Sequence, residues 1–350
     1  MRLKRLVVAL LIIGVLLVAC GGAGQPTPPP APAPLVVASW VGYMPQSILD
    51  AFTEATGIPV EFVAYPDQNV ALDWLRAGRQ LDVVVLGDTN IPSAVAEGLL
   101  AELNFEHIPN FRNLGPNFRD LTFDPENRYS IMIQWGTTGL VVRSDRLVQP
   151  VTSWNELWNP AYAGKIGVWP YREELIGIAL KALGYSLNTE NPEEIRAAGE
   201  KLLALRPQVY LLDPNQATGT ANLLDDQTVM IYGWSYDAAE AHTQMPACVY
   251  VLPEEGTLLW TDNVTIPAGS QRKLEAEEFI NFLLRPAISA EMVNELWLPS
   301  PNEAARPFIK PEILYNPVIY PPMRTLEQAE FYTVVNEETR KLYDEIWERF

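Results

Sequence analysis

The chain has 350 residues, of which 48% are hydrophobic, and it carries 25 lysines and arginines against 43 aspartates and glutamates. Its length corresponds to about two domains with their own cores. The formal net charge of −18 makes nucleic acid and anionic lipid poor partners and favours a cationic ligand, although the acidity also fits a solubility trait of the source organism.

The first residues are typical of a targeting segment. Three basic residues within the first five positions precede the apolar run Leu6–Ala19, and Leu17-Val18-Ala19-Cys20 matches the bacterial lipobox. The run is shorter than the about 20 residues of a membrane span. We therefore predict a lipoprotein signal peptide over residues 1–20, ending at a lipidated Cys20. An uncleaved anchor is the alternative, and both place the rest in the periplasm or on the outer face of the cytoplasmic membrane.

Residues 21–34 consist of Gly, Ala, Pro, Gln and Thr. This composition favours extended polyproline II and predicts a linker. The fold is therefore expected to start at Leu35.

From there, apolar strand candidates alternate with amphipathic helices. Glycines at 57, 78 and 184 are typical helix stops, and Asn191-Pro192 is a strong helix start. Strands are predicted at 35–40, 60–64, 81–86, 130–133, 139–142, 165–169, 228–232 and 249–252. Helices are predicted at 45–56, 69–77, 93–100, 154–158, 172–183, 192–205, 274–284, 288–296 and 336–348. The alternation predicts an α/β fold with parallel-rich sheets flanked by helices.

Nucleophiles and metal ligands are sparse. Cys248 stands in an apolar, strand-like run and is predicted to pack in the core. His107 and His242 have no metal-ligand spacing. Neither a nucleophile elbow nor a P-loop nor a dinucleotide motif is found. We predict a protein that is not an enzyme and needs no cofactor; a secreted hydrolase with paired carboxylates is the remote alternative.

Aromatic residues gather near predicted strand ends. Trp40 and Tyr43 lie just past the first strand, where open α/β sheets bind ligands. Tyr232, Trp234 and Tyr236 alternate, so any extended portion would present them on one face. Such rings are also common as packing residues.

Trp260 and Asp262 have the i, i+2 spacing that places two side chains on the same side of a strand. An aromatic face beside a carboxylate can hold an ammonium group through cation–π attraction and charge-assisted hydrogen bonds.

These residues belong to a set of motifs whose order and spacing resemble the spermidine/putrescine-type solute-binding proteins of ABC transporters. The motifs are Ser39–Tyr43, Tyr129–Gly136, Val151–Gly164, Leu183–Ser186, Trp260–Pro267, Phe279–Pro286, Ser300–Ala305 and Tyr320-Pro321. The resemblance implies a two-lobed periplasmic-binding-protein fold (type II-like) with a hinged cleft. It also implies capture of a polyamine, either spermidine or putrescine, and its delivery to a permease and ATPase by a monomer.

Carried over by position, the resemblance implies ring contacts from Trp40 and Tyr43, an aromatic–carboxylate pair at Trp260 and Asp262, and a second acid at Glu174. Tyr232 stands where the family has a tryptophan, for which Trp234 is a possible substitute.

Several positions depart from the family. Tyr171 replaces an acid, and Arg172 follows it; this arginine is either a ligand for a carboxylate or, by our interpretation, solvated or salt-bridged. A Ser-Thr-Tyr contact segment is replaced by Gly87-Asp88-Thr89-Asn90, so Asp88 and Thr89 become candidate ligands. Tyr332 stands where the family has an amine-binding glutamine.

We expect lobe 1 to comprise residues 35–138 and 262–306, and lobe 2 residues 139–261 and 307–350. Three alternatives remain open: a binder of another small amine or amino-acid-like cation, a ferric iron binder, and a scaffold protein of the envelope.

Overall fold

The computed structural model describes residues 33–216, 218–333 and 335–350. The predicted signal peptide, the lipidated Cys20 and the linker as far as residue 32 lie outside the described residues. Within those ranges, no helix has both the length and the apolar character that a membrane crossing requires.

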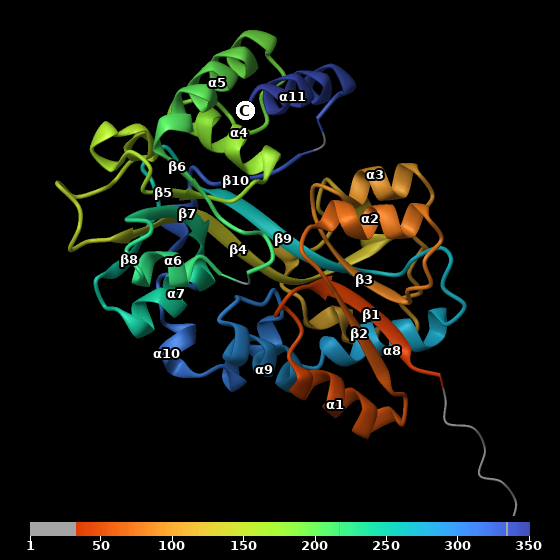
Figure 1. Ribbon diagram of the computed structural model, residues 1–350. Helices are drawn as coiled ribbons and strands as arrows, with labels where there is room; N and C mark the ends of the chain where they lie inside the picture. The colour runs from red at the N-terminus through yellow and green to blue at the C-terminus, as the bar shows by residue number, and fades with distance from the viewer. Residues whose placement is uncertain (1–32, 217, 334) are drawn as a thin grey trace, which may run out of the picture. The chain divides into compact units, whose positions relative to one another are not determined.

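The strands of the described chain form one mixed sheet (Figure 1). They are β1 (Leu35–Trp40), β2 (Val60–Tyr65), β3 (Val83–Gly87), β4 (Ser130–Arg143), β5 (Ile166–Val168), β6 (Val209–Leu211), β7 (Met230–Trp234), β8 (Cys248–Val251), β9 (Leu258–Thr265) and β10 (Glu330–Phe331). Their order is β2-β1-β3-β9-β4-β7-β5-β6, with β10 beside β9 and β8 beside β4. Parallel pairs occupy both ends of this order, whereas β4 and β9 run antiparallel to each other through its middle.

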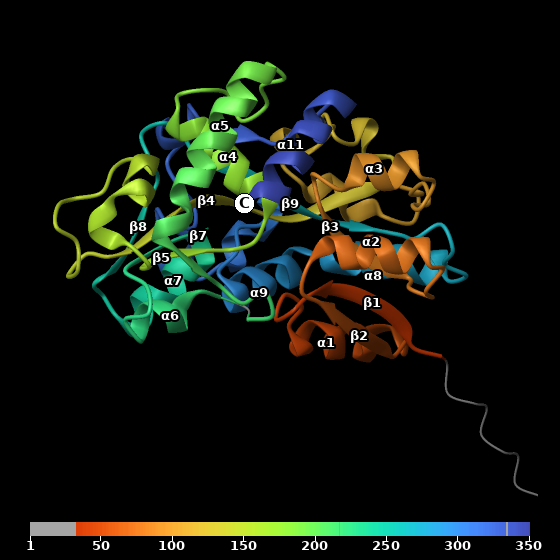
Figure 2. The same ribbon diagram turned by 45° about the horizontal axis from the view of Figure 1, so that its top comes forward.

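Helices flank the sheet on both sides (Figure 2). They are α1 (Gln46–Thr56), α2 (Gln68–Arg76), α3 (Ile91–Ala96), α4 (Arg172–Ala182), α5 (Pro192–Leu205), α6 (Thr220–Leu224), α7 (Ser235–Gln244), α8 (Lys273–Leu283), α9 (Pro286–Leu296), α10 (Pro311–Leu314) and α11 (Glu337–Arg349). Short 3₁₀ helices span Pro109–Asn113, Pro116–Phe118, Pro125–Asn127, Trp154–Trp158, Pro160–Tyr162, Arg206–Gln208, Glu303–Phe308 and Met323–Leu326. The predicted α/β class is confirmed.

Local signals explain several helix ends. The Asn191 side chain accepts a hydrogen bond from the backbone N–H of Glu193 and so caps α5, which begins at Pro192. Gly57 ends α1 with φ of 76°, a conformation that glycine adopts without strain.

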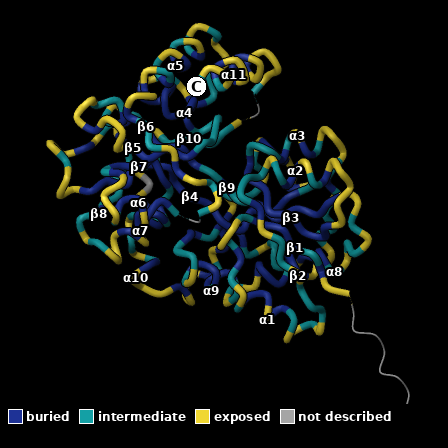
Figure 3. Tube along the Cα trace, viewed as in Figure 1, coloured by how far each residue is buried: buried dark blue, intermediate teal, exposed yellow. Residues whose placement is uncertain are grey.

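Two large clusters of buried residues lie on either side of the middle of the sheet. Figure 3 shows buried stretches of the chain in dark blue in both parts. One contains Ile131 of β4 and Val264 of β9, together with residues of β1, β3, α1 and α8. The other contains Leu140 of β4 and Leu258 of β9, together with residues of β5, β7, α4, α5 and α11, and also Cys248. Thus β4 and β9 pass from one core into the other, and the predicted core role of Cys248 is confirmed.

Strand β4 corrects the prediction of two strands at 130–133 and 139–142, because the structure has one continuous strand of 14 residues. Two glycines within this strand allow close packing. A Cβ atom on Gly136 would lie 2.2 Å from the Trp260 ring, and one on Gly139 would lie 2.6 Å from the carbonyl oxygen of Val251. Gly136 therefore makes room for the indole of Trp260.

Candidate functional site

A cavity of about 820 Å³ lies where elements of both cores meet. Residues at or just after the ends of β1, β2, β3 and β5 line it, together with the first turn of α4, residues along the whole length of α7 and the middle of β9. The carboxyl ends of parallel strands are the usual ligand-binding edge of an open α/β sheet. The volume falls within the range of small-molecule sites, about 300–1,000 Å³.

The structure brings ten of the eleven predicted ligand-binding residues to this cavity. They are Trp40, Tyr43, Asp88, Thr89, Tyr171, Glu174, Trp234, Trp260, Asp262 and Tyr332.

Tyr232 is the exception, and its prediction as a lining residue is wrong. Its side chain is fully buried in the core, and its hydroxyl donates a 2.9 Å hydrogen bond to the carbonyl oxygen of Trp169. Trp234 lines the cavity from the end of the same strand. Helix α7 begins at Ser235, so the rings of Tyr232, Trp234 and Tyr236 do not lie on one face of an extended strand.

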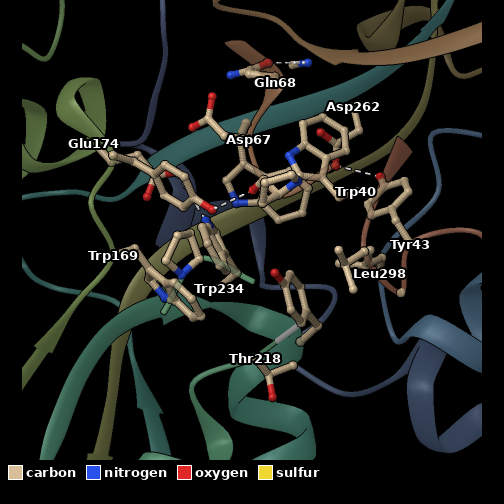
Figure 4. Close-up of a pocket in the computed structure, with 18 of the residues that line it drawn as sticks. Trp40, Tyr43, Asp67, Gln68, Trp169, Glu174, Thr218, Trp234, Asp262 and Leu298 are labelled. Atoms are coloured by element: carbon tan, nitrogen blue, oxygen red, sulfur yellow. Dashed lines mark hydrogen bonds between the residues drawn. The ribbon is translucent and has the colours of Figure 1, made fainter. Parts of the chain in front are cut away.

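At one end of the cavity, Asp262 of β9 lies beside the loop that follows β1 (Figure 4). The Tyr43 hydroxyl donates a 2.6 Å hydrogen bond to Asp262 Oδ2. The ring of Trp40 packs against Tyr43 with centroids 5.4 Å apart. Burial raises the pKa of Asp262 to about 7, and the hydrogen bond from Tyr43 opposes that rise. A cation placed here would gain both an aromatic face and a carboxylate.

Asp88 is the next acid, and it follows β3 directly beside Asp262. Gly87 is the register partner of Asp262, and the Asp88 N–H donates to the carbonyl oxygen of Thr261 at 3.2 Å. Asp88 Oδ1 accepts a 2.8 Å hydrogen bond from the N–H of Thr89, while Oδ2 is buried without a hydrogen-bond partner. Burial, reinforced by the charge of Asp262, raises the pKa of Asp88 well above its ordinary value.

Glu174 stands on the opposite wall, in the first turn of α4 (Figure 4). Its Oε1 accepts a 3.2 Å hydrogen bond from Trp234 Nε1, and its Oε2 is buried without a partner. Burial raises the pKa of Glu174 to about 8. The hydroxyl of Tyr332 is likewise buried and unpartnered, and the charge of Glu174 adds to the burial that raises its pKa.

Aromatic rings form a layered wall beside Glu174. Trp234 stacks on Trp169 at 5.4 Å and on Tyr236 at 5.6 Å. Tyr171 stacks on Trp169 at 6.4 Å, and its hydroxyl reaches the carbonyl oxygen of Pro66 at 3.5 Å, across the cavity. Such a wall presents flat π faces to the methylene groups and ammonium centres of an extended ligand.

The cavity wall is strongly acidic. Seven acids line it in the described chain, at positions 67, 88, 173, 174, 240, 262 and 295. Arg172 is the single lysine or arginine among the described lining residues, and it pairs with Glu173 and Asp344. This pairing agrees with our interpretation that Arg172 is salt-bridged, and it leaves the guanidinium less suited to hold a ligand carboxylate.

Several lining residues were not predicted from the sequence, among them Trp169, Tyr65 and Gln68. Tyr65 ends β2, and Trp169 directly follows β5, so the strand-end rule that selected Trp40 also points to both. Gln68 had no such signal. Its Oε1 accepts from the Gly87 N–H at 2.9 Å and its Nε2 donates to Thr89 Oγ1 at 3.2 Å, which fixes the loop that carries Asp88.

Across the described residues, no group of three or more His, Cys, Asp or Glu side chains is arranged to hold a metal ion. The carboxylates of Asp88, Asp262 and Glu174 are instead spread over the loop after β3, β9 and α4. They stand along aromatic walls, as suits an organic cation with separated charges.

The mixed sheet with two cores and the acidic aromatic cavity between them define a solute-binding protein with the periplasmic-binding-protein fold. Residues 47–314 match the family described as bacterial extracellular solute-binding protein, and the chain belongs to that family.

Individual proteins are similar over most of their length. The spermidine/putrescine-binding periplasmic protein of Salmonella typhimurium is 31% identical over 315 residues, which is 89% of either chain, and the protein of the same name from Escherichia coli is 32% identical over the same share. A solved Listeria monocytogenes protein described as a spermidine/putrescine ABC transporter has a TM-score of 0.84 and 29% identity, covering 90% of this chain and 97% of its own. The polyamine transporter substrate-binding protein of Streptococcus pneumoniae has a TM-score of 0.79 and 26% identity, covering the same shares.

Proposed function

We propose that this protein is the substrate-binding lipoprotein of an ABC importer that captures a polyamine, spermidine or putrescine, and delivers it to a membrane permease. The relatives named for spermidine and putrescine support the ligand class. The observation that carries the proposal is the trio Asp88, Glu174 and Asp262: acids that line one cavity among aromatic rings, where no lysine or arginine of the described chain forms an ion pair with them.

A cationic ligand would offset the free-energy cost of ionising these three acids away from water. A carboxylate taken out of water favours its protonated form unless an opposite charge or hydrogen-bond donors stabilise the ionised form. The ammonium groups of a polyamine provide both, and aromatic faces bind the same groups by cation–π attraction. Ligand contacts are proposed from the ten predicted residues that line the cavity, with Trp169 and Tyr236 added to the wall.

Closure of the cavity is proposed as a movement of two lobes, residues 35–138 with 262–306 and residues 139–261 with 307–350. The separate cores joined by β4 and β9 support this division. Ligand contacts from both lobes would shift the population toward a closed form, which the permease and its ATPase would recognise. The hydrogen bond from Tyr171 to the carbonyl oxygen of Pro66 is a contact that closure brings together.

The lipidated Cys20 and the linker give the proposed protein its location, on the outer face of the cytoplasmic membrane or in the periplasm. A flexible tether keeps a binder at high effective concentration near its transporter. Incorporation of radiolabelled palmitate into the full chain tests the lipid anchor, and we expect the Cys20→Ser variant to lose the label. Equal labelling of the wild-type protein and this variant would contradict lipidation at Cys20.

A thermal-shift panel tests the ligand class, because a ligand that binds the native state raises its melting temperature. Putrescine and spermidine are compared with butanediol, an uncharged analogue, and with arginine, which carries a carboxylate. We expect a shift with the polyamines only. A shift of equal size with arginine would favour an amino-acid-like ligand instead.

A further inference from the structure

We propose that Asp88 forms a third cation subsite, and that the slot therefore selects a ligand with three cationic nitrogens over a ligand of equal length with two. The inference rests on the proposed function, and it names the charge class of the ligand and the residue that sets it.

The position of Asp88 makes it part of the slot. It lines the cavity although only 3% of its surface is exposed. It follows β3 where Gly87 faces Asp262, so two acids from neighbouring strands stand at the same end of the cavity. Glu174 stands on the opposite wall, on α4, beside Glu173, which pairs with Arg172.

The hydrogen bonds around Asp88 leave one of its oxygens without a partner. Oδ1 accepts from the Thr89 N–H, whereas Oδ2 is buried and has no donor among the described residues. The loop is fixed by Gln68, which bonds both Gly87 and Thr89. A buried carboxylate oxygen that is held in place without a donor is costly. A ligand N–H that reaches it would remove this cost.

A purely structural role does not explain why position 88 carries an acid. The bond from Asp88 to the Thr89 N–H needs only an acceptor, which an asparagine would supply equally well without a buried acid. Among the described residues, Arg172 is the one lysine or arginine that lines the cavity, and it pairs with Glu173 and Asp344 rather than with Asp88.

Charge balance then decides the number of cations. A ligand with two ammonium groups can neutralise Asp262 and Glu174, whereas burial and the neighbouring charge of Asp262 raise the pKa of Asp88 and so favour its protonated form. A third cationic nitrogen lets Asp88 ionise and pair with it. Binding a triamine should therefore release more protons than binding a diamine.

Titration calorimetry with two ligands of matched length separates the effect of ligand charge from the effect of ligand length. Spermidine carries three cationic nitrogens, and octamethylenediamine has a backbone of the same length with two. We expect the wild-type protein to bind spermidine at least about tenfold more tightly. Repeating the titration in buffers of different ionisation enthalpy should show the extra proton release.

Asp88→Asn keeps the acceptor for Thr89 and removes the charge. It should bring the two affinities to within about threefold of each other, mainly by weakening spermidine by about tenfold or more. Asp88→Glu restores the charge and should recover part of the preference. Asp225→Asn, which removes one exposed acid outside the cavity lining, should behave as wild type.

Equal affinity of the wild-type protein for the two ligands would overturn the inference, as would an Asp88→Asn variant that weakens both by the same factor. Both results leave a polyamine binder in place. If neither ligand binds the wild-type protein, the proposed function fails together with the inference.

Discussion

Tyr43 and Asp262 are 219 positions apart in the chain, yet the Tyr43 hydroxyl donates a 2.6 Å hydrogen bond to Asp262 Oδ2. Tyr43 follows the first strand, and Asp262 lies in β9, one of the two strands that pass from one core into the other. The bond gives the buried carboxylate one fixed donor, which favours its charged form. It leaves Oδ1 for other partners and places the Tyr43 and Trp40 rings beside the charge.

Replacing Tyr43 with phenylalanine tests this arrangement. The ring stays and the donor is lost, so the pKa of Asp262 should rise further and polyamine binding near neutral pH should weaken by about 1–2 kcal/mol. Calorimetry measures the change. Tyr162→Phe is the matched control, because that hydroxyl accepts from the Val148 N–H in the other core. Wild-type affinity in the Tyr43→Phe protein would show that the Tyr43 hydroxyl does not contribute to binding.

Polyamine affinity should depend on pH in a definite direction. In the unliganded protein the pKa of Asp262 is about 7 and that of Glu174 about 8, raised in both cases by burial. A bound cation stabilises the ionised acids, so binding competes with protons. The dissociation constant should rise as pH falls from about 8.5 to about 6, by up to about tenfold per pH unit for each acid that is protonated. A constant affinity across this range would contradict the assignment of both acids.

Glu174→Gln should separate stability from binding. A folded-state pKa raised to about 8 means that the acid contributes stability that is fully present below its unfolded pKa and is lost as pH rises through about 8. Glutamine keeps an acceptor for Trp234 Nε1 and cannot ionise.

The unliganded variant should therefore be more stable than wild type at about pH 9, by roughly 1–3 kcal/mol, and similar to it at about pH 5. Denaturant unfolding at both pH values measures this. The same variant should bind a polyamine more weakly. A variant that is less stable than wild type at high pH would show that the charge of Glu174 is stabilised within the protein itself.

Gly136→Ala tests the placement of the Trp260 indole. The new methyl group would lie 2.2 Å from the ring, so the indole must shift or the strand must distort. We expect a loss of stability of about 1–3 kcal/mol and a clear loss of affinity. Gly269→Ala is the control, because a Cβ atom there meets nothing within 4 Å, and its stability and affinity should stay close to those of the wild type. If Gly136→Ala binds normally, Trp260 is not a ligand contact.

Much of the fold follows from local patterns. Helix caps such as Asn191 and stops such as Gly57 are set by neighbouring residues, so their positions agree with prediction. Strand β4 was predicted as two pieces, whereas the structure has one strand in which Gly136 makes room for the indole of Trp260, a residue distant in sequence. Packing partners of this kind cannot be read from a local pattern.

In the site, too, some residues follow from local patterns and others depend on packing between distant parts of the chain. Trp40 and Trp260 follow from strand-end and i, i+2 patterns, and both line the cavity. Tyr232 and Trp234 also have i, i+2 spacing, but only the structure shows that Tyr232 is fully buried, with its hydroxyl bonded to the backbone carbonyl of Trp169. The positions of Asp88 and Gln68 depend on which strands become neighbours, which local periodicity does not specify.

Calorimetry of the wild-type protein and Asp262→Asn with spermidine and putrescine is the sharpest test of whether the acids and rings of this cavity bind a polyamine. We expect saturable binding by the wild-type protein at about pH 8 and a loss of about 2–5 kcal/mol in the variant, since it removes one partner of a buried charge pair. Absence of heat with both ligands up to millimolar concentration, or an unchanged dissociation constant in Asp262→Asn, would contradict the account.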